Sequence, residues 1–102
     1  MSFNDIRRII STQSVALAST SQASGAKLSS QTYAIEVGFI SAAGVGAFVN
    51  VGSNLVQANS TNAGALVAAN YPRTYKTNPG QTVAGQCVGS TAVTLYITEL
   101  GA

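Results

Sequence analysis

Few side chains in this sequence could perform acid–base or nucleophilic chemistry. Histidine is absent, and the three carboxylates, Asp5, Glu36 and Glu99, lie far apart and share no motif. Histidine is the commonest base and metal ligand in proteins, and a nucleophilic serine needs an activating base beside it. Lys27 and Lys76 are the remaining candidates for that base, and neither sits in a recognisable arrangement. We therefore expect a protein that is not an enzyme and that holds neither a metal nor a cofactor.

The single cysteine, Cys87, has no partner for an intrachain disulfide. Its setting, VAGQCVG, is apolar and contains no histidine or cation that would activate the thiol. We predict that Cys87 behaves as a small, buried and unreactive hydrophobic residue. The lack of intrachain disulfides is compatible with synthesis in a reducing cytosol.

The polar surface of this chain must be built almost without charge. Its 102 residues suit one domain with one modest core, and only 8% of them are charged, against about 25% in ordinary soluble domains. No charged residue occurs from position 37 to position 72. A surface hydrated by serine, threonine, asparagine and glutamine alone protects poorly against association. The composition therefore favours a protein that assembles.

The same composition disfavours nucleic acid and membrane as partners. The net charge is +2, and only Arg7 and Arg8 are adjacent cations, so no basic stripe could neutralise several phosphates. No apolar run approaches the roughly 18 residues of a membrane span. The opening segment, MSFNDIRRII, lacks the apolar stretch of a secretory signal peptide. We expect neither a nucleic acid nor a membrane as partner.

The N-terminal segment fits either a helical turn or a strand. Ser2 and Asp5 have the spacing of a capping box, and a helix starting there would place Ile6, Ile9 and Ile10 on one face. The following sequence, RIISTQSVAL, is rich in β-branched residues and favours extended chain.

We predict an arm that leads into a first strand near residues 9–17. In domain terms, residues 1–12 are an N-terminal arm or the first strand, and residues 13–102 are a β-sandwich. The small polar residues at 19–31 are typical of a loop. The well-patterned strands all lie within residues 31–100, which we expect to close a core by themselves.

Alternation of apolar and polar residues predicts most of the strands. It runs from residue 33 to residue 39 within TYAIEVGFI, where Glu36 falls on the solvent side. It returns in AFVNVGS at 47–53 and in TAVTLYITEL near the C-terminus. ALVAANYP at 65–72 suits an edge, because proline cannot donate to a ladder. Short strands without a convincing long helix indicate an all-β fold. We predict a single small antiparallel β-sandwich or jelly-roll-like domain with an N-terminal arm.

A type II turn is predicted at Asn78, Pro79, Gly80 and Gln81. Proline presets φ for the second position of such a turn, and glycine supplies the positive φ that the third position requires. The turn should connect RTYKT to the strand QTVAGQCV.

An exposed recognition patch is one hypothesis for the segment NYPRTYK, which contains Tyr71, Arg73 and Tyr75. The alternative, which we favour, is that Tyr75 packs on the sandwich while Tyr71 closes one end of it.

The order of these pieces resembles a known class of proteins. IRRIISTQSVAL precedes SQTYAIEV, then FVNVGSN, a variable loop, YPRTYKTNPGQTVAGQCV and a closing STAVTLYITEL. This order is similar to that of small β-sandwich virion structural proteins of tailed bacteriophages and cyanophages, which decorate or cement the capsid. The Gly-Ser after the second clear strand, the Pro-Gly-Gln turn and the terminal Thr-Glu-Leu carry the resemblance, which spans most of residues 7–100.

The resemblance implies a capsid cement or decoration protein that is made in the host cytoplasm and binds the exterior of the assembled head. Its implied partners are the major capsid protein and further copies of itself in a homotrimer. The apolar and basic N-terminal segment is the expected capsid contact, and its candidate residues are Phe3, Ile6, Arg7, Arg8 and Ile9. The alternatives are a receptor- or glycan-binding module of a head fibre or tail fibre, and another neck or tail structural component.

Overall fold

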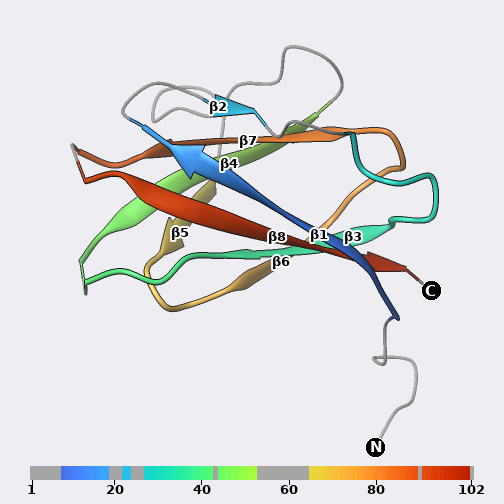
Figure 1. The fold of residues 1–102 in the computed structure, drawn as a ribbon, viewed down its shortest axis with the longest axis horizontal. Helices are drawn as coiled ribbons and strands as arrows, with labels where there is room; N and C mark the ends of the chain where they lie inside the picture. Colours follow the sequence, from blue (N-terminus) through green and yellow to red (C-terminus); the bar gives the residue numbers. More distant parts are fainter. Residues whose placement is uncertain are drawn as a thin grey trace, which may run out of the picture.

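The computed structural model describes residues 8–18, 22–23, 27–42, 44–52, 65–89 and 91–101. Within these ranges the chain forms strands and no helix (Figure 1). The strands are β1 (Arg8–Leu17), β2 (Gln22–Ala23), β3 (Ala34–Gly38), β4 (Gly46–Gly52), β5 (Ala65–Ala68), β6 (Arg73–Lys76), β7 (Thr82–Cys87) and β8 (Val93–Gly101).

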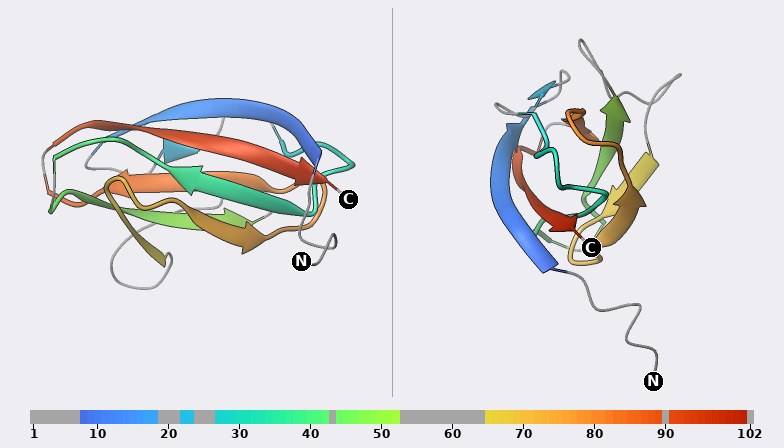
Figure 2. Two further views of the ribbon diagram at one scale, coloured as in Figure 1. Left: turned by 90° about the horizontal axis from the view of Figure 1, so that it is seen from below. Right: turned by 90° about the vertical axis from the view of Figure 1, so that its right-hand side faces the viewer.

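The strands form two four-stranded antiparallel sheets, which pack as the two layers of a sandwich (Figure 2). The first sheet has the order β1-β8-β3-β6, and the second has the order β2-β7-β4-β5. The pairs β1–β8, β2–β7, β3–β6 and β4–β5 mean that the first half of the chain pairs with the second half in reverse order. This is the jelly-roll arrangement of a β-sandwich. The predicted fold class is confirmed.

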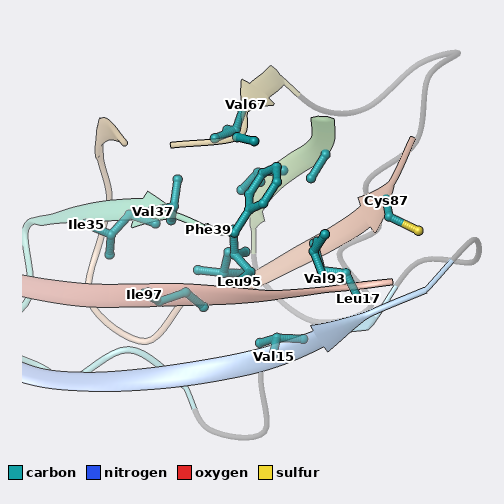
Figure 3. Close-up of a cluster of buried hydrophobic side chains, with 14 of the residues drawn as sticks. Val15, Leu17, Ile35, Val37, Phe39, Val67, Cys87, Val93, Leu95 and Ile97 are labelled. Atoms are coloured by element: carbon teal, nitrogen blue, oxygen red, sulfur yellow. The ribbon is translucent and has the colours of Figure 1, made fainter. Parts of the chain in front are cut away.

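The core lies between the two sheets and follows the alternation of the strands. On β8, Val93, Leu95 and Ile97 are buried, whereas Thr94 and Tyr96 are exposed on the other face. The second sheet contributes buried Ala47, Val49, Val67, Val83 and Cys87 to the same cluster. Figure 3 shows the Phe39 ring among side chains from both layers. The predicted burial of Cys87 is confirmed, since its side chain is 3% exposed.

The expectation that residues 31–100 close the core by themselves is wrong. Val15 and Leu17 of β1 and Leu28 of the β2–β3 connection are buried members of the core cluster. Leu17 packs directly over β7, where a Cβ atom placed on Gly85 would lie 2.7 Å from Leu17 Cδ2. Strand β1 and Leu28 are therefore part of the sandwich, and β1 supplies one complete strand of the first sheet.

Strand β1 begins at Arg8 and pairs with β8 along its length, with a register shift between Ile9 and Ser11. The predicted strand at 9–17 is confirmed, and residues 8–12 belong to it. The helical turn weighed for the segment from Ser2 lies outside the described residues. Within the predicted loop at 19–31 the structure places the short strand β2, which pairs Gln22 with Gly85 and Ala23 with Ala84. Two residues are too few to show a period, so this pairing depends on the position of β7.

The turn predicted at Asn78–Gln81 is confirmed. Gly80 has a φ of 81°, and the Gln81 amide donates to the Asn78 carbonyl at 3.4 Å. The Gly80 amide also donates to the Leu28 carbonyl at 3.1 Å, and the Leu28 amide donates to the Gln81 carbonyl at 2.7 Å. The turn carries the chain from β6 in the first sheet to β7 in the second, and it holds the β2–β3 connection at the same end.

Candidate functional site

A buried carboxylate, Glu99, forms the densest polar cluster among the described residues. Its side chain is 3% exposed and continues the inward-facing series of β8. One carboxylate oxygen accepts hydrogen bonds from the Ser29 amide at 2.7 Å and from Thr32 Oγ1 at 2.9 Å. The other accepts from Ser11 Oγ at 3.0 Å and from Gln13 Nε2 at 3.4 Å. Glu99 therefore ties β1, β8 and the chain leading into β3 together.

The surroundings of Glu99 make it an ionised acceptor. Burial raises the pKa of its carboxyl, but the hydrogen bonds from the Ser29 amide and from three side chains outweigh burial and hold the pKa below its ordinary value. A general base or acid working near neutral pH needs a pKa close to that pH. The cluster is thus suited to structural support and unsuited to proton transfer.

In the sequence Glu99 stands as an isolated carboxylate, and no local pattern predicts this cluster. Its partners are 67 to 88 positions away in the sequence, so no local motif can reveal them. One signal was present, because the alternation of Val93, Leu95 and Ile97 places Glu99 on the core side of the same strand.

Glu36 is exposed, as predicted, and borders a hollow on the outer face of the first sheet. We call this the outer hollow; its volume is about 360 Å³. Gly38 is paired with Tyr96 and Glu36 with Thr98 across β3 and β8. Pro72 stands close above Gly38, where an added Cβ atom would lie 3.2 Å from Pro72 Cβ. The outer hollow thus combines an aromatic ring, a proline ring, a carboxylate and a hydroxyl.

A second hollow, of about 510 Å³, lies beside β5 and is mainly apolar. We call this the apolar groove. Its lining includes Leu66, Tyr71 and Val88, all of which are exposed large side chains. Both hollows lie outside the core, on surfaces where apolar side chains meet solvent.

The structure separates the residues of the hypothetical patch in NYPRTYK. Tyr71 is 71% exposed and borders the apolar groove, and Arg73 is exposed on β6. Tyr75 is half-buried and packs against the core, as the favoured alternative expected. Its buried hydroxyl has no hydrogen-bond partner among the described residues. Tyr71 and Tyr75 therefore do not form one exposed surface.

The candidate capsid-contact residues lie partly outside the described part of the chain, because Phe3, Ile6 and Arg7 precede it. Arg8 belongs to β1, and its guanidinium donates to Gln31 Oε1 at 2.7 Å. Ile9 is 65% exposed. Of the two described residues, Ile9 presents free apolar surface, whereas Arg8 is tied to the chain ahead of β3.

Two absences hold within the described residues. No group of three or more cysteines, aspartates or glutamates lies close enough together to hold a metal ion. In the same ranges, no helix has the length and apolar character needed to cross a membrane.

Comparison with known proteins gives a likeness of fold. No family model matches the chain, and no curated protein matches its sequence. A solved structure of Bacillus endospore appendages, described as forming a novel family of disulfide-linked pili, is similar over 100% of this chain and 96% of its own, with a TM-score of 0.54 and 15% sequence identity. At that identity the similarity shows that the two chains share a fold.

Proposed function

We propose that this protein is a virion structural subunit that decorates the exterior of an assembled phage capsid and stabilises it. The observation that carries the proposal is the distribution of side chains on the described surface. The densest polar cluster serves the fold through Glu99, whereas large apolar and aromatic side chains, including Tyr71, Leu66 and Tyr96, are exposed. Exposed apolar patches of this kind mark interaction surfaces.

Association in many copies suits such a molecule. A capsid repeats the same local surface many times, so a small subunit can act through modest contacts made at every site. A protein that binds the assembled shell and not its dissociated parts stabilises the shell by mass action. This task requires shape and contact area, and it requires no titrating group.

The fold likeness supports a structural role without specifying it. The neighbour comes from a structure of endospore appendages described as forming disulfide-linked pili. In the present chain Cys87 is the only cysteine, and it is buried in the core. A covalent bond between copies through Cys87 would require the core to open, so the proposed association is non-covalent.

Binding to undecorated capsids tests the proposal. The purified protein should co-sediment with capsids that lack it. It should also raise the temperature at which those capsids release their contents. Bovine serum albumin at the same concentration serves as the control for trapped protein. Heads that neither bind the protein nor gain thermal resistance would contradict the proposal.

The outer hollow favours a second candidate, a glycan- or receptor-binding module of a head fibre or tail fibre. Ligand sites are concave, with apolar or aromatic walls and a few polar groups that fix orientation. Tyr96, Pro72 and Glu36 provide these elements. The isotope-labelled protein is titrated with host surface polysaccharide while its chemical shifts are recorded. This candidate predicts shift changes at the residues around Tyr96, and Tyr96→Ala should abolish them. Shifts that are absent, or that survive Tyr96→Ala, would exclude this site.

A further inference from the structure

We propose that β1 pairs with β1 of a second copy of this chain, antiparallel across a two-fold axis, so that the two first sheets join into one eight-stranded sheet. The inference rests on the proposed role as an associating subunit. It is tested on the isolated protein, so its failure can be distinguished from a failure to bind capsids.

The first observation is the open edge of β1. Strand β1 is at the end of the order β1-β8-β3-β6, and its ladder pairs it with β8 alone among the described strands. It runs along one flank of the sandwich (Figure 2). The Ala18 carbonyl, just beyond the strand, accepts from the Cys87 amide at 2.9 Å. That contact joins the end of β1 to the second sheet, whose strands β2 and β7 also contact β1.

The second observation is that the four sheet edges differ in how well they are protected against pairing with a strand of another chain. Natural proteins guard edges with short strands, charged side chains, prolines and bulges. The β6 edge has 4 residues that include Arg73 and Lys76, and Pro72 precedes it. The edges at β5 and β2 have 4 and 2 residues. Strand β1 has 10 residues and a single charge, Arg8, at its first position.

The register shift between Ile9 and Ser11 protects the beginning of β1, because a bulge twists an edge away from a partner. From Ser11 to Leu17 the register is regular. The available edge is therefore STQSVAL, which contains no charge and no proline. It has none of the devices that guard β6.

Charge decides the orientation of the pair. Parallel pairing of two β1 strands would place one Arg8 beside the other. Antiparallel pairing centred on Ser14 places the two Arg8 residues roughly 40 Å apart, at about 3.4 Å of rise per residue. Thr12, Ser14 and Ala16, which are exposed, then meet across the axis without like charges. The neutral edge is thus complementary to itself.

The protected β6 edge also explains why the partner is β1 rather than the opposite edge. Pairing of β1 with β6 would be head-to-tail and would continue into rings or filaments. Arg73, Lys76 and Pro72 oppose that pairing. A two-fold β1–β1 contact closes on itself, so it predicts a discrete pair of chains. Such a pair is a different assembly from the homotrimer that the family resemblance implies.

Sedimentation equilibrium of the isolated protein tests the proposal. The wild type should have twice the mass of one chain. Ser14→Lys places two ammonium groups against each other at the axis and should have the mass of one chain. Thr94→Lys is the matched control, because Thr94 is exposed on the same face of the same sheet but belongs to the interior strand β8. It should keep the wild-type mass. Thermal melts of all variants confirm that each is folded.

Hydrogen exchange identifies the contact. Amides of β1 between Ser11 and Leu17 that do not face β8 should exchange slowly in the wild type and at least tenfold faster in Ser14→Lys. A wild type with the mass of one chain or of three chains would overturn the proposal. So would a pair of chains in which these amides exchange freely, because it would be formed through another surface.

Discussion

Glu99 joins three segments of the chain that are far apart in sequence. Its carboxylate accepts from Ser11 and Gln13 on β1 and from Ser29 and Thr32 ahead of β3. A buried carboxylate is costly unless its lone pairs are satisfied. Here four donors satisfy it, so the residue fixes the position of β1 relative to the chain that enters β3.

Replacing Glu99 should lower stability and change its dependence on pH. Glu99→Gln leaves the Ser29 amide and the Thr32 hydroxyl with a neutral acceptor and should cost about 1–3 kcal/mol in the free energy of unfolding at neutral pH. Because the folded pKa of Glu99 is below its ordinary value of 4.5, its ionisation stabilises the fold fully above the unfolded pKa. That contribution is lost as the pH falls through the folded pKa.

Urea unfolding at a series of pH values measures the free energy of unfolding and its dependence on pH. The wild type should lose stability steeply below about pH 4.5, and Glu99→Gln should lose less over the same range. Glu36→Gln is the matched control, because Glu36 is exposed, and it should follow the wild type. Equal slopes for Glu99→Gln and the wild type would show that the cluster does not stabilise the folded state.

In the turn at Asn78–Gln81, a β-branched residue cannot replace Gly80 without backbone strain. Its φ is 81°, so Gly80→Val should cost about 1–2 kcal/mol through backbone strain. Pro79→Ala should cost less, because it mainly increases the freedom of the unfolded chain. Thermal melts compare the two variants. A Gly80→Val protein with the same melting temperature as the wild type would refute the strain argument.

At the scale of strands, local patterns predicted most of the fold and long-range pairings did not follow from them. Alternation located the strands now seen as β3, β4 and β8, and the Pro-Gly pair located the turn before β7. The two residues of β2 are too few to show an alternation of apolar and polar side chains, and they form a strand because they pair with β7. The Glu99 cluster and the contribution of β1 to the core were missed for the same physical reason. Their contacts join residues from opposite halves of the chain, and no short window of sequence contains both partners.

The contact between β1 and β7 is a sensitive point of the sandwich. Gly85→Ala would place a Cβ atom 2.7 Å from Leu17 Cδ2, and Leu17 is buried. Overpacking of this kind should cost about 1–3 kcal/mol. The double variant Leu17→Val with Gly85→Ala should recover part of the loss, which urea unfolding of the single and double variants measures.

Gly46→Ala is the matched control on the neighbouring strand β4. Its added Cβ would lie 3.2 Å from Leu66 Cδ1, and the exposed Leu66 side chain can move away. The control should therefore lose less stability than Gly85→Ala. Equal losses for the two alanine variants, or a double variant whose loss is the sum of the single losses, would contradict tight packing of Leu17 on β7.

Removing the residues before β1 tests their expected role as the capsid contact without altering the described strands. Deleting residues 2–7 removes Phe3, Ile6 and Arg7 but keeps Arg8, whose guanidinium contacts Gln31. We predict a folded protein, with the melting temperature of the full chain, that no longer co-sediments with undecorated capsids. Full occupancy of capsids by the shortened protein would show that residues 2–7 have no docking role.

A decorating subunit should occupy every equivalent position of the capsid surface. Quantitative mass spectrometry against the major capsid protein measures the number of copies per purified virion. The proposal predicts on the order of hundreds of copies, matching the number of equivalent positions on an icosahedral shell. Absence from the virion, or roughly a dozen copies or fewer as expected for a vertex or tail component, would contradict it.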